Sequence, residues 1–103
     1  MYTVIAKIIA KPEFTKELKE SLEALIEPTI AEHGCIKYIL HESVDDPCLF
    51  MFYEIWQSKQ ACDFHLNSAH IKNWVEISKP FLQSWELFFL RAISTAESPA
   101  IAD

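Results

Sequence analysis

Two segments of this chain are apolar on both faces of the strand that each predicts, and this feature limits the possible folds more than any other. Residues 2–10 (YTVIAKIIA) and 48–56 (CLFMFYEIW) carry apolar side chains at odd and even positions alike. Successive side chains of a strand point to opposite faces, so both faces need cover, and a layer of helices covers only one. The apolar side chains that cannot all lie beneath one helical layer are Ile5, Ile9, Phe50, Phe52, Phe88 and Leu90. We therefore expect a homodimer in which the second face packs against the sheet of another copy of the chain.

The segment between these two strands predicts a helix and a further strand. Residues 13–33 have apolar side chains at helical spacing, and Pro28 is expected to kink or break the helix. The periodic residues are Phe14, Leu18, Leu22, Leu25, Ile26 and Ile30. Gly34, the only glycine, suits the left-handed position that follows a helix. Residues 35–42 predict the next strand.

The second half of the chain adds two short helices and a last strand. Residues 59–66 and 69–78 predict the helices, with Ser58 and Ser68 as their N-caps. Residues 85–93 predict the last strand. The resulting order is that of the split βαβ, ferredoxin-like plan, an α+β fold with an antiparallel sheet and its helices on one face.

Length and charge set the number of domains and the class of partner. With 103 residues the chain has room for one domain, predicted over residues 1–93. Residues 94–103 are expected to form a C-terminal tail, either a loose end or an arm over a partner. Nine basic against fifteen acidic residues give a net charge of −6, which disfavours nucleic acid. No apolar run approaches the ~18 residues of a membrane span and the N-terminus lacks a signal-peptide pattern, so we expect a cytoplasmic protein without membrane contact.

Several common catalytic motifs are absent from the sequence. The chain has no G-x-x-x-x-G-K-[ST], G-x-G-x-x-G or G-x-S-x-G, which disfavours ATP, NAD and α/β-hydrolase chemistry. The three cysteines, Cys35, Cys48 and Cys62, form no C-x-x-C pair, so we interpret them as free thiols that pack as small hydrophobes. Cys62, near His65, is the main alternative candidate for a nucleophile.

Residues 53–70 gather groups that are suited to proton transfer. Glu54 alternates with Phe52 and Trp56, so the three side chains share one face of the predicted strand. A carboxyl group among aromatic rings has a raised pKa, which suits a general acid or base. The equally weighted alternative is an edge glutamate that reaches solvent or pairs with Arg91.

His65 and His70 are the candidate imidazoles, because this side chain transfers protons best near neutral pH. For either histidine alone, a purely structural or exposed role is the commoner outcome. The two are five residues apart across a predicted break, unlike the i, i+4 pair that is typical of zinc ligands, so we expect no metal site. His33 and His41 have no evident partner and are expected at the surface.

Aromatic residues around this segment form either core or the walls of an apolar pocket between the helices and the sheet. Core is the commoner role for any single ring, but a pocket needs only two or three rings. The residues concerned are Trp56, Trp74, Trp85, Phe64 and Phe81.

Several short motifs follow one another in a set order along residues 2–93. They start with TVIAKIIAKP, Glu32-His33-Gly34-Cys35, Tyr38 and Asp45-Asp46-Pro47. They continue with Phe52-Tyr53-Glu54-Ile55-Trp56, Ser58-Lys59-Gln60-Ala61 and His65-Leu66-Asn67-Ser68-Ala69-His70. Together they resemble the antibiotic biosynthesis monooxygenase (ABM) domain family. This resemblance implies a dimeric α+β barrel, in agreement with the element order derived above.

The resembled family includes three kinds of enzyme: cofactor-independent oxygenases of phenolic and quinol compounds, an isomerase of phosphorylated autoinducer-2, and heme-degrading enzymes. Heme-degrading members use a first-strand Asn with a Trp and a His. The corresponding positions here look like Lys7, His65 and Val75, which argues against heme degradation.

The isomerases resemble this chain locally, through Tyr53-Glu54 and Phe64-His65 with His70. Their phosphorylated substrate would need a cationic anchor, for which Lys37 and Arg91 are the candidates. An isomerase would need no O₂, and a non-catalytic dimeric small-molecule-binding protein is the other alternative.

The interpretation that we favour is a homodimeric enzyme that oxidises a small aromatic quinol or phenol with O₂ and without metal or flavin. His65, with Glu54 as its partner or alternate, is the predicted base. Tyr53 and His70 are predicted to hydrogen-bond substrate oxygens. The side chains expected to hold the substrate ring are Trp56, Phe64 and Trp74.

Overall fold

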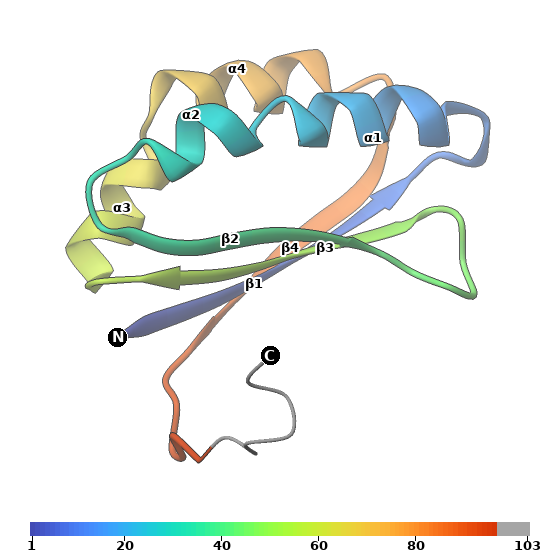
Figure 1. Cartoon of the computed structure of the whole chain (residues 1–103). Helices are drawn as coiled ribbons and strands as arrows, with labels where there is room; N and C mark the ends of the chain where they lie inside the picture. Colours follow the sequence, from blue (N-terminus) through green and yellow to red (C-terminus); the bar gives the residue numbers. More distant parts are fainter. Residues whose placement is uncertain (97–103) are drawn as a thin grey trace.

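The structure, a computed structural model, describes residues 1–96 (Figure 1). Residues 97–103, which make up most of the predicted C-terminal tail, lie outside the described part. The elements of the first half are β1 (Tyr2–Ala10), the 3₁₀ helix η1 (Pro12–Phe14), α1 (Thr15–Glu23), α2 (Ile26–Ile30) and β2 (Cys35–Glu42). Those of the second half are β3 (Leu49–Trp56), α3 (Lys59–Leu66), α4 (Ala69–Ile77) and β4 (Leu82–Leu90).

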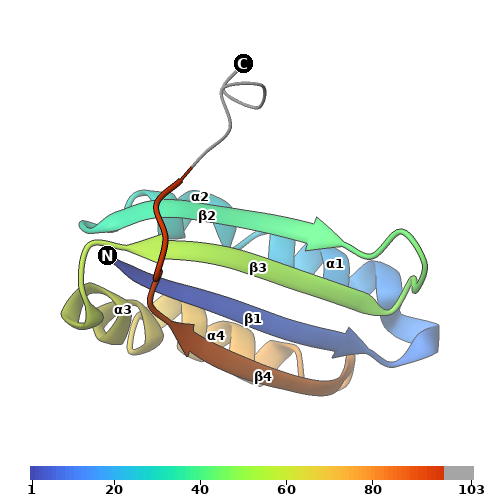
Figure 2. The same ribbon diagram turned by 90° about the horizontal axis from the view of Figure 1, so that it is seen from below.

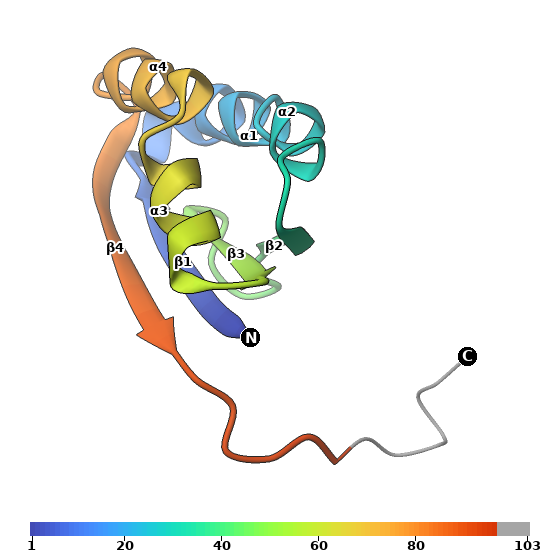
Figure 3. The same ribbon diagram turned by 90° about the vertical axis from the view of Figure 1, so that its left-hand side faces the viewer.

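The four strands form one antiparallel sheet in the order β2-β3-β1-β4. The helices all lie on one side of this sheet, and the view from below shows no helix on its other side, where the segment that follows β4 passes in front of the strands (Figure 2). Seen end-on, the sheet curves beneath the helical layer (Figure 3). β2 and β4 are edge strands, so the sheet does not close on itself. The predicted α+β, ferredoxin-like architecture is confirmed.

Strand alternation separates a covered face, beneath the helices, from an open face. The register aligns Ala6 with both Phe52 and Leu87, and Ile5 with both Tyr53 and Phe88, so the division runs across the sheet. The covered face carries the buried residues Val4, Ala6, Ile8, Ala10, Tyr38, Phe50, Phe52, Glu54 and Trp56. The open face carries the apolar residues Ile5, Ile9, Ile39, Met51, Tyr53, Ile55, Phe88 and Leu90. The six side chains expected to divide between two faces do so.

The predicted helix over residues 13–33 is in fact a 3₁₀ turn and two α-helices that end at Ile30. Pro28 has no amide hydrogen to donate to the carbonyl of Ala24, and the helix is interrupted at Ala24 and Leu25. The interruption rotates α2 relative to the helical repeat of α1, so a different side of α2 faces the sheet. Thr29 is therefore buried, whereas Ile30, expected on the apolar side, is 57% exposed.

Gly34 has the expected left-handed backbone, with φ of +93°. A Cβ at this position would lie 2.7 Å from the Cβ of Ala61 at the start of α3. The glycine therefore serves two purposes, because it reverses the chain after α2 and lets β2 begin close to α3.

The last strand lies three residues earlier than predicted, at Leu82–Leu90 instead of residues 85–93. Pairing with β1 explains the shift, since Ala10 pairs with Leu82 and Thr3 with Leu90, close to the two ends of β1. β3 and α4 match their predicted ranges to within one residue, and β1, β2 and α3 match fully.

Both predicted N-caps occupy the N-cap position of their helix, but only Ser58 makes a capping hydrogen bond. The Ser58 hydroxyl accepts a hydrogen bond from the Ala61 amide at 3.1 Å. The Ser68 hydroxyl makes no capping bond and donates to the carbonyl of His65 at 2.6 Å. Ser68 thus joins the end of α3 to the start of α4.

No helix within residues 1–96 is long and apolar enough to cross a bilayer.

The three cysteines are unpaired, as predicted, and Cys62 is buried. Burial raises the pKa of the Cys62 thiol to about 12, which argues against its use as a nucleophile.

Candidate functional site

A small cavity lies between the covered face of the sheet and the helices. Its volume is about 30 Å³, and its polar side chains are Tyr38, Glu54 and His65. Trp74 of α4 and Trp85 of β4 also line it and pack edge to face, with ring centroids 5.7 Å apart. The site is therefore mostly apolar, with a few convergent polar groups, as small-molecule sites generally are.

A wider surface groove adjoins this cavity between α4 and β4. The groove has a volume of about 460 Å³ and shares Leu66, Ile71, Trp85 and Leu87 with the cavity lining. The cavity alone has room for roughly two water molecules. Any ligand larger than this would have to enter from the groove and displace side chains at the mouth, where Trp85 is 40% exposed.

Glu54 occupies the covered face near the end of β3. Its side chain is buried, and Oε1 accepts a hydrogen bond from Nε1 of Trp56 at 3.0 Å. Burial raises the pKa of Glu54 to about 7, the Trp56 hydrogen bond opposes this rise, and the charge of Glu32 adds to it. The carboxyl can thus accept or release a proton near neutral pH. The alternative of an edge glutamate in solvent or beside Arg91 does not hold, since Glu54 is 4% exposed and Arg91 lies at the surface.

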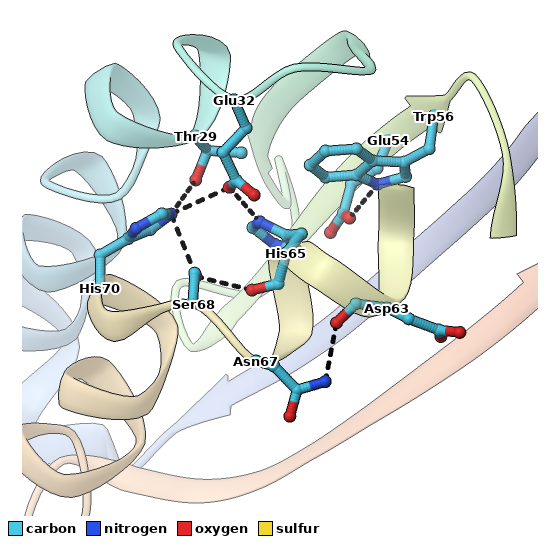
Figure 4. A network of polar contacts seen from close by, with 9 residues as sticks. All are labelled: Thr29, Glu32, Glu54, Trp56, Asp63, His65, Asn67, Ser68 and His70. Carbon is cyan, nitrogen blue, oxygen red and sulfur yellow. Dashed lines mark hydrogen bonds and ion pairs between the residues drawn. The ribbon is translucent and has the colours of Figure 1, made fainter. Parts of the chain in front are cut away.

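Glu32, in the turn after α2, joins the two candidate histidines (Figure 4). Its Oε2 atom lies 2.6 Å from Nδ1 of His65 and 3.0 Å from Nε2 of His70. The Nε2 atom of His70 also lies 3.1 Å from Oγ1 of Thr29 and 3.4 Å from Oγ of Ser68. The break between α3 and α4 turns the second histidine toward the same carboxylate, so a five-residue spacing does bring the two rings together.

His65 is the buried imidazole of this network. Its ring packs against Trp56 and Tyr38, with centroids 4.5 and 5.5 Å away. Burial lowers the pKa of His65, although the hydrogen bond and the charge of Glu32 act in the opposite direction. In the neutral imidazole, Nδ1 donates to the carboxylate and Nε2 keeps its lone pair. Because Glu32 engages Nδ1, Nε2 is the ring nitrogen left for a ligand.

Comparison with known proteins assigns the family. The family model for antibiotic biosynthesis monooxygenase matches residues 1–77. The chain belongs to this family. The match ends in α4, so β4 and its contributions to the cavity, Trp85 and Leu87, lie beyond the matched ABM segment.

Individual relatives of this ABM chain agree with the assignment. It is 41% identical over 71 residues to the Mycobacterium tuberculosis protein named "Putative monooxygenase Rv0793", covering 69% of each chain. It is 32% identical over 79 residues to an uncharacterised Synechocystis protein, but spans only 54% of that protein's length. In solved structures, PA3566 from Pseudomonas aeruginosa has a TM-score of 0.86 at 32% identity, with 90% of this chain and 94% of that chain covered. Rv0793 itself has a TM-score of 0.85 at 31% identity, with 93% and 98% covered.

The structure brings only some of the predicted ABM site residues to the cavity. His65, Glu54 and Trp74 line it, and Trp56 lies behind, against His65 and Glu54. His70 is connected to it through Glu32.

Two predicted site residues lie elsewhere. Tyr53 lies on the open face, because alternation turns it away from the Glu54 side. Phe64 is 72% exposed on the outer side of α3. Neither of these two side chains can reach a ligand in the cavity, whatever its role elsewhere. His33 and His41 are exposed, as expected.

Sequence reasoning missed Glu32 and Tyr38 as site residues. Glu32 stands in one of the motifs that carry the family resemblance, and it also follows a helix end, where the helix dipole disfavours a carboxylate; these were the two available signals. Tyr38 also stands among those motifs, but its place in a predicted strand gives no indication of a site role. Its ring stacks on Phe52 with centroids 4.2 Å apart, and burial raises the pKa of its hydroxyl, which therefore stays protonated as a donor.

Proposed function

We propose that this ABM protein is a cofactor-independent monooxygenase that oxidises a small aromatic quinol or phenol with O₂. The observation that carries the proposal is the buried His65 imidazole, held by Glu32 at Nδ1 and bordering an aromatic cavity. A carboxylate on the far nitrogen fixes the tautomer and stabilises the imidazolium that forms when Nε2 takes a proton. A neutral base among aromatic rings suits removal of a phenolic proton.

The proposed reaction needs no electrons from outside the substrate. His65 removes one phenolic proton of a hydroquinone, and the electron-rich anion reacts with O₂ in a site from which water is excluded. One oxygen atom enters the ring to give a hydroxyquinone, and the other leaves as water with two hydrogens of the substrate. Glu54, with a pKa of about 7, can return a proton to the departing oxygen.

The remaining cavity residues have binding roles in this proposal. Tyr38 lines the cavity, and its hydroxyl would donate to a substrate oxygen in the role first expected for Tyr53. Trp74 and Phe52 provide apolar contact for the substrate ring, and Trp56 supports His65 from behind. His70 acts on Glu32 and does not touch the substrate.

We also propose that two copies of the chain pair through their open faces, in the cytoplasm. Ile39, Phe88 and Leu90 are each more than 40% exposed on this face, and a group of exposed apolar side chains on one face is typical of an interaction surface. Three unpaired cysteines fit a reducing compartment. Sedimentation velocity should give a dimer for the wild type and a monomer for Phe88→Glu. A monomeric wild type at micromolar concentration would refute the pairing.

Oxygen uptake by the metal-stripped protein with a panel of quinols and anthrones tests the activity. His65→Ala should lower the rate about 10²–10⁴-fold, the usual contribution of a general base. His41→Ala is the matched control, because it removes an exposed histidine that does not line the cavity, and it should keep the wild-type rate. Full activity in His65→Ala would refute the assigned base.

The second candidate is an isomerase, favoured by one observation: two proton-transfer groups, His65 and Glu54, border the same cavity. They could move a proton next to a carbonyl without O₂. The cationic anchors considered for a phosphorylated substrate, Lys37 and Arg91, do not line the cavity. Turnover of a phosphorylated hydroxyketone under anaerobic conditions would favour this candidate, and binding without any turnover would favour a non-catalytic binding protein.

A further inference from the structure

We propose that Glu32, His65 and His70 form a binding site for a divalent first-row transition metal. Their candidate ligand atoms, Oε2, Nδ1 and Nε2, lie within 4.8 Å of one another. The three side chains come from the turn after α2, from α3 and from the first turn of α4, and they point toward one another (Figure 4). Nothing in the proposed oxygenase reaction requires this convergence of a second histidine.

The donor set selects the class of ion. Two imidazole nitrogens and one carboxylate oxygen are the ligands of zinc in many catalytic sites and of iron, cobalt and manganese in others. Mg²⁺ and Ca²⁺ prefer all-oxygen ligands, so the site should discriminate against them. Three protein ligands leave at least one coordination position for water.

An unpaired oxygen of Glu32 is a second and independent indication of a ligand. The Glu32 side chain is 7% exposed, and its Oε1 atom is buried. Within the described residues, this is the one buried side-chain polar atom without a hydrogen-bond partner. Leaving a carboxylate oxygen buried and unsatisfied costs free energy, and a cation that the carboxylate binds through both oxygens would supply the missing partner of Oε1.

The charges around the cluster also favour a cation. Glu54 is buried in the same region, close enough for the charge of Glu32 to act on it. Two carboxylates and two neutral imidazoles give the region a charge of −2 when both acids are ionised. A divalent ion neutralises that charge without any further group.

Binding requires a small expansion of the cluster. Bonds of about 2.1 Å in a tetrahedral site place ligand atoms roughly 3.4 Å apart. The observed distances from Glu32 Oε2 are 2.6 Å to Nδ1 of His65 and 3.0 Å to Nε2 of His70. These are hydrogen-bond lengths, so the ligand atoms must move slightly apart to admit the ion. Each neutral imidazole would move its proton to the other ring nitrogen and coordinate through the freed lone pair.

This tautomer change has a consequence that rests on the proposed function. A metal on Nδ1 of His65 leaves Nε2 as an N–H donor, which cannot remove a proton from the substrate. The ion and the catalytic base therefore exclude one another. The metal is an inhibitor in this scheme, and binding itself does not depend on whether the protein is an oxygenase.

Titration with Zn²⁺ after chelator treatment tests the binding. We expect the wild type to bind one Zn²⁺ per chain by calorimetry, and Co²⁺ to give the visible absorption bands of a four-coordinate site. Glu32→Gln, which keeps the side-chain shape, and His70→Ala should each weaken binding at least about tenfold, while His41→Ala should bind as the wild type does. Circular dichroism confirms that each variant is folded.

Three results would overturn the site: no saturable Zn²⁺ binding to the wild type, unchanged affinity in both site variants, or equal loss in His41→Ala. These results leave the oxygenase proposal intact, because that proposal uses the metal-free protein. Once oxygen uptake is established, Zn²⁺ should abolish it at the concentrations that fill the site, and uptake that persists in the filled protein would refute the inhibitory role.

Discussion

The two faces of the sheet use the same strands for different purposes. On β3, Glu54 points beneath the helices into the cavity, and its neighbour Tyr53 points to the open face. The covered face combines apolar packing with buried polar groups that are linked to helix residues. The open face carries half-exposed apolar side chains, and no buried polar group of its described residues is bonded to a helix residue.

This difference follows from what lies over each face. The helices exclude water from the covered face, so a carboxyl or imidazole there has a perturbed pKa and needs a partner. The open face has no helices over it, and its apolar area is stabilised only if another surface covers it. Chemistry is therefore expected on the covered face and association on the open face.

The largest expected contrast is in stability. Phe52→Ala removes a buried ring that stacks on Tyr38, and it should lower the free energy of unfolding by about 3–5 kcal/mol. Phe88→Ala, on the open face, should cost less than about 1 kcal/mol in the single chain. Urea unfolding at several protein concentrations separates the effect on folding from an effect on association. Equal losses at low concentration would contradict the division into two faces.

The pH dependence of stability sharpens the description of the covered face. The pKa of Glu54 rises from 4.5 to about 7 on folding. Between these values the folded protein holds a proton that the unfolded chain has released, so the free energy of unfolding should fall as the pH rises. The full effect is at most roughly 3 kcal/mol.

Glu54→Gln isolates this contribution, since the opposing effect of His65, whose pKa is lowered, is common to both proteins. The variant should gain stability relative to the wild type between pH 5 and pH 8. Urea unfolding at four pH values, with EDTA present, measures the difference. Parallel curves for the two proteins would mean that folding does not raise the pKa of Glu54.

Activity provides a third contrast between the two faces, here through the sequence neighbours Glu54 and Tyr53. Glu54→Gln should lower the oxygen-uptake rate by at least about tenfold, because the amide cannot exchange a proton. Tyr53→Phe should change the rate less than about twofold, since its hydroxyl lies on the open face. Steady-state uptake with one responsive quinol decides the matter. A large loss in Tyr53→Phe would mean that the substrate binds on the open face, which would contradict the proposed cavity.

The smallest expected effect concerns the helix that carries His65. Ser58→Ala removes the capping bond to the Ala61 amide and should cost about 1 kcal/mol of stability. Ser58→Asn keeps an acceptor and should remain near the wild type. Thermal unfolding of the three proteins tests the cap, and equal losses in both variants would show that the hydroxyl bond is not its source.

The sequence by itself determined the α+β order, the left-handed Gly34 and the pairing of Glu54 with aromatic neighbours. These follow from short-range causes: strand alternation, helical spacing and the conformational freedom of glycine. It also identified His65 and Glu54 as candidates, because their residue types and neighbours are visible in one segment of the chain.

Only the tertiary structure decided how the first helix divides, where β4 ends and which groups meet at the site. Glu32 and His65 are 33 positions apart in the sequence, and no local pattern predicts that two helices and a turn bring them to 2.6 Å. The ends of β4 depend on its pairing with β1, and the roles of Tyr53 and Phe64 changed because exposure is set by packing. Local preferences act within a few residues, whereas a buried polar network requires each distant partner to be in place at once.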